Sequence, residues 1–562
     1  MTIGERDDRP EPAASQRRVF AGRGAVASFL AVLVLGLLLG LGVRPLELEE
    51  PRRALVALEM SLRGDLVVST TNGALYLNKP PLFSWLLLGL MRLTGGAGEA
   101  WLRLPTVLSF LLVGAALAAA ARPLGRTTAL LAPVLFFTFG DLLFYGTLHA
   151  DIDLFFTLLV TLQALAVFGL EQRGRPLALF AVSYLLAAIA FLTKSYPALA
   201  FQALTLLAWL VAARRARWLF SWQHLAGLAV FLALVGGYFL LYAQRADAGR
   251  YLLRLLLDSS ERTVVASRHG AGALLVQLVA FPLTLVKACL PWSIFAGLLF
   301  LPAFRARVRA EPLLKFAAIF VVVNALPYWL SPGTRPRYLF PLLPFVALLL
   351  AAALPHLAER GAYARAARWA LGVALALGAV APLALPLLPE AWRLVEHRWA
   401  WFLGAAALAG AAVAFWRAPA LPGRVLALAL ALALARVEYD LVVPALRRAR
   451  SEATFLRGVA DELDRDHRGA RIFLAGVEKV EERRIPLLGG TASFRRPEWF
   501  PMSLSFYYSA ARGEILPYAT SPRPGDLLLA HVRYEVGRPH DLVKTWRAAQ
   551  QKDDLKLVRV RE

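Results

Sequence analysis

Long apolar runs recur along almost the whole chain and alternate with short polar loops. A run of about 17 or more apolar residues is long enough to cross a bilayer as a helix. Runs of this kind lie near residues 25–43, 104–121, 127–147, 154–170, 177–193, 198–213, 219–243, 273–303, 313–330, 338–355, 367–388, 399–416 and 423–441. The pattern therefore predicts an α-helical polytopic membrane protein with about thirteen transmembrane helices.

Residues 80–94 are apolar but short and open with two prolines, so their hydropathy does not decide whether they cross. The positions of the basic loops decide whether this segment crosses. If residues 80–94 stay on one side, these loops share the cytoplasmic side with the N-terminus, as positive loops should. They lie near residues 122–126, 173–175, 214–217, 305–309, 360–368 and 417–424. We therefore expect residues 80–94 to form a juxtamembrane or re-entrant helix.

This topology divides the chain into three parts. Residues 1–24 are polar and are predicted to be a disordered cytoplasmic tail before an uncleaved first helix. Residues 25–443 form the membrane domain, whose first outer loop covers residues 44–103. Residues 444–562 have a soluble composition and are predicted to form a small C-terminal α/β domain outside the membrane.

In the C-terminal domain, RARSEATFLRGVADELDRDHRG is read as an amphipathic helix, and ARIFLAGV and DLLLAHV as strands. SLSFYYSAARGE is predicted to be a strand or a strand followed by a turn. Since no catalytic motif is evident here, binding or capping of a site in the membrane domain is expected more than chemistry.

Composition supports the membrane class. The chain is 58% hydrophobic and 18% charged, with a mean hydropathy of +0.55, which lies outside the soluble range. The net charge of +23 would suggest nucleic acid in a soluble protein, but the arginines gather in short loops as topology signals do, so no nucleic acid partner is expected. The single cysteine, Cys289, excludes an intramolecular disulfide.

The first candidate chemistry lies in residues 46–85, a polar loop directly after the first apolar run. It contains the paired carboxylates Glu49 and Glu50, followed by Pro51 and a predicted interfacial helix. Carboxylates at a helix N-terminus can simply be partners of the helix dipole. Their doubling, and the presence of other carboxylates in outer loops, favours a site.

A second acidic pair, Asp151 and Asp153, stands beside His149 in GTLHADIDLFF, at the mouth of a predicted span. A solvated loop end is one interpretation of this pair. The other is a site, because ionisable groups at this depth are costly unless they are wet or paired.

Cations accompany the carboxylates in four outer loops. Converging lysines and arginines suit a phosphate-bearing substrate, although each one alone could be a residue snorkelling to the interface. The set comprises Lys79, Lys194, Arg262, Arg335 and Arg337. His269, in one of these loops, is ambiguous by itself.

The stretch EEPR…LRGDLVV…NGALYLNKPPLFSW resembles the opening loop of bacterial GT-C glycosyltransferases of the protein O-mannosyltransferase and lipid A aminoarabinose transferase family. Later landmarks follow in the same order: WLRLP, FLTKSYP where the family has Leu-Thr-Lys-Gly-Pro, PWS, and RPRYLFPLLP. The resemblance covers about residues 20–350. It implies the GT-C fold.

The resemblance also implies roles for residues at matching positions. Glu49 takes the family's first catalytic acidic place, with Glu50 beside it, and Asp151 or Asp153 takes the second, Asp151 being preferred. Lys79 matches the lysine of the Lys-Pro-Pro motif, and a divalent metal held by His269 with Glu49 is one option. Asn78 stands where the family has glutamate, which argues against that metal site. The phosphate-binding set is extended by Arg52, and the further site residues are Tyr76, Asn78, His269 and Tyr338.

Such enzymes transfer a sugar from a polyprenyl-phosphate donor to an acceptor on the outer side of the bacterial inner membrane, with inversion. Lipid A, another glycolipid, a polysaccharide and a protein all remain open as acceptors, and we expect a monomer surrounded by membrane lipids. Two other classes are compatible with a polytopic chain of this kind: a transporter or lipid flippase, and a non-catalytic assembly component. Against transport, no inverted repeat is evident, and the ionisable groups lie on one side.

Overall fold

The computed structural model describes residues 12–260, 271–359, 361–393, 395, 398–476, 478–484, 491–497, 501–548 and 554–561. The chain forms two compact units. The first comprises Met1–Gly40 with Pro355–Ala445, and the second comprises Leu41–Leu354 with Leu446–Glu562.

The first unit is helical. Its elements are α1 (Pro12–Leu39), η6 (Leu354–Glu359), α16 (Gly361–Val380), η7 (Ala381–Leu387), α17 (Pro389–Trp392), α18 (Arg398–Arg417) and most of α19 (Leu421–Arg450). Helix α1 begins inside the segment predicted as a tail. Within α19 the buried Arg436 Nε lies 2.6 Å from Asp440 Oδ2, so these two charges neutralise each other inside an apolar helix.

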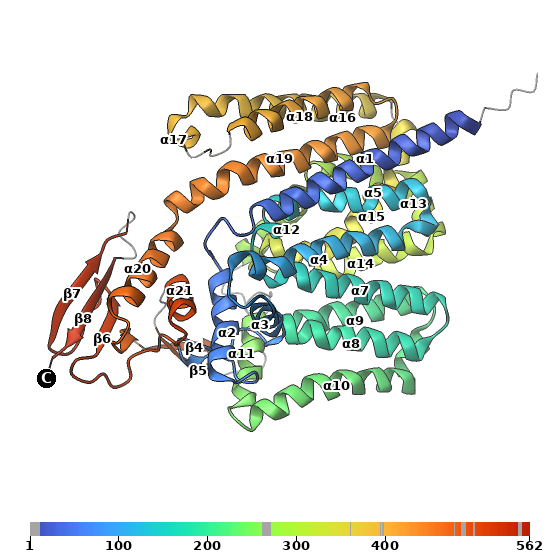
Figure 1. Ribbon diagram of the computed structural model, residues 1–562. Helices are drawn as coiled ribbons and strands as arrows, with labels where there is room; N and C mark the ends of the chain where they lie inside the picture. Colours follow the sequence, from blue (N-terminus) through green and yellow to red (C-terminus); the bar gives the residue numbers. More distant parts are fainter. Residues whose placement is uncertain are drawn as a thin grey trace, which may run out of the picture. The chain divides into compact units, whose positions relative to one another are not determined.

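The second unit holds the remaining membrane helices (Figure 1). Helices α7 (Ile152–Gln172) and α10 (Trp222–Ala243) both pack against α8 (Pro176–Lys194), and α5 (Arg126–Phe137) packs against α4 (Glu99–Ala120) and α15 (Leu343–Ala353). Its elements before the C-terminal domain are α2 (Glu50–Arg63), β1 (Thr70–Thr71), β2 (Ala74–Leu75), α3 (Leu82–Thr94), α4 (Glu99–Ala120), η1 (Arg122–Leu124), α5 (Arg126–Phe137), α6 (Gly140–Phe144), η2 (Gly146–Leu148), α7 (Ile152–Gln172), α8 (Pro176–Lys194), α9 (Pro197–Ala212), η3 (Ala216–Phe220), α10 (Trp222–Ala243), α11 (Ala248–Ser260), α12 (Ala271–Ala288), η4 (Trp292–Phe300), α13 (Pro302–Ala310), α14 (Pro312–Trp329), η5 (Pro336–Leu342) and α15 (Leu343–Ala353).

Among the described residues, eight helices are long and apolar enough to cross a membrane, or nine if the bent pair Arg126–Phe137 and Gly140–Leu148 is one span. Three further predicted spans fall on shorter apolar helices, Gly24–Leu39, Pro197–Ala212 and Gly272–Ala288, and the last predicted span falls on α19. The predicted polytopic helical class is confirmed, while the count of thirteen stays a prediction. Helix α3 has only 13 residues, too few to cross a bilayer of ordinary thickness.

The C-terminal domain contains a four-stranded sheet of order β3-β6-β8-β7. Strands β3 (Ile472–Leu474) and β6 (Leu527–His531) are parallel, whereas β8 (Leu555–Val560) runs antiparallel to β6 and to β7 (His540–Trp546). Strands β4 (Glu478–Arg484) and β5 (Thr491–Pro497) form a separate hairpin, and α20 spans Glu452–Asp466. The predicted amphipathic helix and both predicted strands are therefore confirmed.

The prediction of a strand for SLSFYYSAARGE is wrong, because these residues form α21 (Met502–Arg512). The alternation of serine with large apolar residues resembles a strand, but every residue from Ser503 to Ser509 is buried. The small serines let α21 pack between α20 and α2, and this packing overrides the local pattern. Gly513, with φ 70°, ends the helix in the left-handed conformation.

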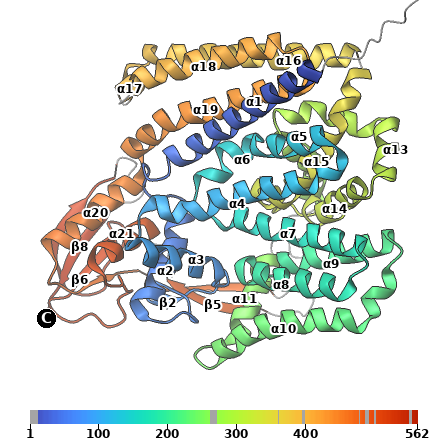
Figure 2. The same cartoon turned by 45° about the vertical axis from the view of Figure 1, so that its right-hand side comes forward.

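One apolar core joins this domain to the first outer loop. It includes Leu55 of α2 and Phe83 of α3 together with Leu456 of α20 and Leu504 and Tyr508 of α21. Figures 1 and 2 both show α21 beside α2. The loop that carries the first candidate carboxylates is therefore held between the membrane helices and the C-terminal domain.

Candidate functional site

Glu50 anchors the first outer loop. Its carboxylate receives Arg103 Nε at 2.7 Å and Arg103 Nη2 at 3.0 Å, and it also accepts the backbone N–H groups of Ala150 at 2.6 Å and Glu47 at 2.9 Å. Arg103 gives its other donors to the carbonyl oxygens of Leu41, Arg44 and Pro45, so all five of its N–H groups are used. Glu50 is 1% exposed and Arg103 is fully buried. These contacts support an anchoring role for Glu50 rather than a catalytic one.

Glu49, the residue before α2, differs from Glu50 in being partly open. Its Oε2 lies 2.8 Å from Arg52 Nη1 and 4.0 Å from Arg53 Nη2, and 28% of its side chain is exposed. Burial acts to raise the pKa of Glu49, but the charges of Arg53 and Arg52 outweigh it, so the pKa lies below its usual value. Glu49 is thus an ionised carboxylate with an accessible edge.

Arg53 was not predicted as a site residue from the sequence, but it connects two that were, Tyr76 and Glu49. Its Nη1 donates to the hydroxyl of Tyr76 at 2.6 Å while its other amino group faces Glu49. Tyr76 is 6% exposed and lies after the β1–β2 hairpin. Tyr76 therefore supports the cation beside Glu49.

The second acidic pair meets two cations. Arg337 Nη1 lies 2.7 Å from Asp151 Oδ2, and Arg337 Nε lies 3.5 Å from Asp153 Oδ2. Lys194 pairs with the other oxygen of Asp153. Asp151 caps α7, since its Oδ1 accepts the N–H of Ile152 at 2.7 Å. Burial, together with the neighbouring charge of Asp153, raises the pKa of Asp151 to about 6.

The two acidic pairs and Arg337 line one small hollow of about 20 Å³. This volume has room for about one water molecule. Its lining residues are Leu48, Glu49, Glu50, Tyr145, Gly146, His149, Asp151, Asp153, Leu154, Arg337 and Phe340. The structure thus brings together the two predicted acidic pairs, which are separated by about a hundred residues in the chain.

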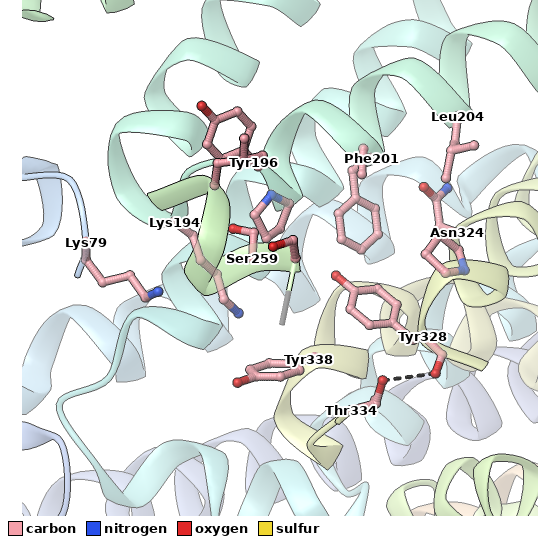
Figure 3. Close-up of a pocket in the computed structure, with 15 residues that line it drawn as sticks. Lys79, Lys194, Tyr196, Phe201, Leu204, Ser259, Asn324, Tyr328, Thr334 and Tyr338 are labelled. Atoms are coloured by element: carbon pink, nitrogen blue, oxygen red, sulfur yellow. Dashed lines mark hydrogen bonds between the residues drawn. The ribbon is translucent and has the colours of Figure 1, made fainter. Parts of the chain in front are cut away.

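A larger pocket of about 280 Å³ contains two of the predicted phosphate ligands (Figure 3). Its walls are mainly apolar and aromatic, and Lys79 and Lys194 are its two charged residues. The remaining lining residues are Tyr196, Pro197, Ala200, Phe201, Leu204, Leu256, Ser259, Ser260, Asn324, Pro327, Tyr328, Thr334 and Tyr338. Because Lys194 lines this pocket and pairs with Asp153 of the hollow, the two spaces are neighbours.

Helix α11 holds Lys79. Lys79 Nζ lies 2.7 Å from Asp258 Oδ2, and the hydroxyl of Tyr251 donates to the Lys79 carbonyl oxygen at 2.7 Å. Asp258 was missed in the sequence because it ends an amphipathic segment, RYLLRLLLDSS, and belongs to no matching motif. A phosphate entering the pocket would compete with Asp258 for Lys79.

Other predicted residues are less central. Arg335 is exposed and Asn78 is half-buried, and neither lines the hollow or the pocket. Arg262 and His269 lie outside the described residues. Within the described ranges, no group of three or more His, Cys, Asp or Glu could hold a metal ion. The described residues therefore do not by themselves fit a metal site.

The FLTKSYP motif places Ser195 in a strained position. Ser195 follows Lys194 at the end of α8 with φ 63° and ψ −140°, where the resembling family has glycine. Non-glycine residues in such conformations cost about 1–3 kcal/mol. The strain is localised beside a predicted site residue.

Replacing Ser195 by glycine is expected to raise the free energy of unfolding by about 1 kcal/mol, because glycine adopts a positive φ without steric cost. Thermal unfolding of both proteins in detergent would measure this change in stability. Ser183→Gly in the middle of the same helix is the control and should destabilise the protein, because glycine is a poor helix former and because the hydroxyl that accepts Gln202 Nε2 is lost. Equal losses for both variants would contradict the strain argument.

The fold and the site define a class. A polytopic helical membrane protein with acidic groups in the loops between its helices and a small sheet region at its C-terminus corresponds to the GT-C glycosyltransferase fold. The crystal structure of ArnT from Cupriavidus metallidurans bound to undecaprenyl phosphate has this fold. It superposes with a TM-score of 0.67, covering 96% of this chain and 98% of that chain at 18% identity. The predicted fold is confirmed.

Comparisons of sequence show which glycosyltransferases this chain is similar to. Residues 78–239 match the family model described as dolichyl-phosphate-mannose-protein mannosyltransferase. The undecaprenyl phosphate-alpha-4-amino-4-deoxy-L-arabinose arabinosyl transferase of Pseudomonas paraeruginosa is 29% identical over 344 residues, which is 60% of each chain. The protein of the same name from Edwardsiella ictaluri is 27% identical over 62% of each chain. The predicted resemblance to this family is confirmed, over matches that span about three fifths of these relatives.

Proposed function

We propose that this protein is an inner-membrane glycosyltransferase that transfers a sugar from an undecaprenyl-phosphate donor to an acceptor on the periplasmic face. The observation that carries the proposal is the pairing of the carboxylate-lined hollow with an apolar pocket that contains two lysines. In the proposed topology the N-terminus is cytoplasmic and the C-terminal domain is periplasmic. The chain acts as a monomer.

The apolar pocket suits the donor. Its aromatic and aliphatic walls would take the first isoprene units, and Lys79 and Lys194 would take the phosphate as point charges. Tyr338 also lines this pocket, and Lys194 Nζ lies 5.1 Å from the centre of its ring. Phosphate binding at Lys79 would replace the contact with Asp258.

The side chains around the hollow suit the reacting centre; the hollow itself has room for about one water molecule, so the sugar would lie at its edge. The acceptor attacks the anomeric carbon of the sugar, the bond from that carbon to the phosphate oxygen breaks, and the lipid phosphate leaves with both bonding electrons. The carboxylates of Glu49 and Asp151 would stabilise the oxocarbenium-like state. A single displacement inverts the configuration.

The acceptor decides whether a base is required. A hydroxyl acceptor loses its proton to a carboxylate as the new bond forms. A phosphate acceptor needs only positioning and charge compensation. Lipid A, another glycolipid, a polysaccharide and a protein are the acceptor classes to compare.

The contacts favour Asp151 over Asp153 as the second acidic group. Asp153 faces both Lys194 and Arg337, and its side chain is 7% exposed, whereas Asp151 faces Arg337 and is 16% exposed. The charge of Asp153 is the better compensated of the two. We therefore assign Asp153 to positioning of the cations.

The direct experiment uses the full chain in lipid nanodiscs with a radiolabelled undecaprenyl-phosphate sugar and membrane extracts containing each acceptor class. Covalent labelling of one class supports the proposal. The alternative, a transporter or lipid flippase, is tested in sealed vesicles. Movement of the lipid across the bilayer with no covalent transfer would favour that alternative and overturn the proposed function.

The pH profile of the transfer is expected to show an acidic limb near pH 6. Burial and the charge of Asp153 both favour protonated Asp151, so its pKa is raised to about 6. The carboxylate is therefore present above this pH and is lost below it, and kcat should fall about tenfold per pH unit there. Circular dichroism at each pH controls for unfolding. A flat profile from pH 7 to pH 5 would contradict this role.

A further inference from the structure

The C-terminal domain holds the backbone directly before Glu49. The N–H of Leu46 donates to the hydroxyl of Tyr507 at 2.7 Å, and the Leu46 carbonyl oxygen accepts the hydroxyl of Ser503 at 3.2 Å. Both contacts come from α21 and reach across more than 450 residues of sequence. Both polar groups of this fully buried residue are thus satisfied by the C-terminal domain.

Tyr507 is itself held in place. Its hydroxyl donates to Glu99 Oε1 at 3.0 Å, and the Arg457 guanidinium reaches the same oxygen at 2.8 Å while lying 5.0 Å from the centre of the Tyr507 ring. The Tyr507 hydroxyl therefore accepts from the first outer loop and donates to the first turn of α4. It connects three elements through one atom.

The same segment is also held at Glu47 and at Glu50, on either side of Glu49. Glu50 is tied to Arg103 and to the Ala150 N–H, and Ser451 donates to Glu47 Oε1 at 2.8 Å. Between these anchors Leu48 has φ 57°, which costs a non-glycine residue about 1–2 kcal/mol. A strained residue beside a candidate catalytic group persists only where its surroundings enforce it.

We propose that the hydroxyl of Tyr507 is a positioning group that fixes residues 46–49 and thereby orients the Glu49 carboxylate in the hollow. This inference rests on the proposed function for the role of Glu49. It gives the C-terminal domain a defined task, which is to brace the first outer loop from outside the membrane helices.

The test compares Tyr507→Phe with Tyr508→Phe. Tyr508 is the next residue of α21 and its ring is also buried in the shared core, where phenylalanine keeps it, but its hydroxyl faces Arg512 rather than residues 46–49. The Tyr507 variant should lower kcat by about 10- to 100-fold, because small misplacements of a reacting group cost about 10²-fold. The KM for the donor should stay unchanged, since the lysine pocket is intact. The Tyr508 variant should keep kcat.

Hydrogen exchange measured by mass spectrometry gives a readout that does not depend on catalysis. The peptide containing residues 46–49 should exchange about tenfold faster in the Tyr507 variant than in the Tyr508 variant, because a buried donor has lost its acceptor. Should Tyr507→Phe fail to fold, Ser503→Ala removes the partner contact and should show smaller changes in the same direction.

Unchanged kcat and unchanged exchange in Tyr507→Phe would overturn the proposal, as would faster exchange without any loss of kcat. A wild-type protein that transfers no sugar would instead overturn the proposed function. Even then, the exchange comparison decides whether Tyr507 fixes residues 46–49.

Discussion

Replacing Glu49 by glutamine is expected to lower the rate of sugar transfer by about 10²- to 10⁴-fold, which is the usual contribution of a positioned carboxylate. Glutamine has the same shape but cannot accept a proton or stabilise positive charge at the anomeric carbon. Arg52 and Arg53 would lose a charged neighbour, yet the fold should persist because 28% of the Glu49 side chain is exposed and Arg53 keeps its contact with Tyr76. The measurement is single-turnover transfer from the labelled donor in nanodiscs.

Two further variants sharpen this result. Glu49→Asp keeps the carboxylate on a shorter arm, which the resembling family uses at this place, and should retain more activity than Glu49→Gln. Glu171→Gln is the control: Glu171 is buried at the far end of α7, about 30 Å from Asp151 along the helix axis, and should transfer normally. A glutamine variant of Glu49 with wild-type kcat would remove Glu49 from the mechanism.

Replacing Arg103 by methionine is expected to have the largest effect on folding. Breaking a buried ion pair by removing one partner costs about 3–5 kcal/mol, because the remaining charge is left uncompensated. Removing the guanidinium also leaves the carbonyl oxygens of Leu41, Arg44 and Pro45 without the donor that they have from Arg103. The yield of monodisperse protein in detergent and its midpoint of thermal unfolding should both fall sharply.

Arg92→Met serves as the control, since Arg92 is an exposed arginine of the neighbouring helix α3 and should leave the midpoint nearly unchanged. The double variant Arg103→Met with Glu50→Leu should lose less free energy of unfolding than the two single variants lose together, because neither charge is then left alone. Additive losses would show that Arg103 and Glu50 do not act as a pair.

These two predictions separate adjacent glutamates that look alike in the sequence. Glu49 and Glu50 share a type, a loop and a position near the start of a helix. Both line the hollow, and only their partners and exposure distinguish them: Glu50 meets a fully buried arginine 53 residues away, whereas Glu49 meets Arg52 and keeps 28% of its side chain exposed. A doubled carboxylate signals a site but does not say which member is free to act.

The sequence by itself determined the polytopic helical class, the acidic and basic loops between the apolar runs and the resemblance to GT-C glycosyltransferases. These rest on hydropathy, charge and ordered motifs, which are local properties of the chain. The prediction made from the sequence is wrong at α21, where a local alternation resembles a strand but tertiary packing on α2 and α20 imposes a helix.

Only the tertiary structure decided which side chains meet. The pairing of Lys79 with Asp258 spans 179 residues, and the contact of Leu46 with Tyr507 spans 461. No local pattern encodes such distances, because each depends on how several packed helices orient their ends. For this reason the acidic pairs were predictable as candidates, whereas Arg103, Asp258 and Tyr507 emerged from the three-dimensional arrangement.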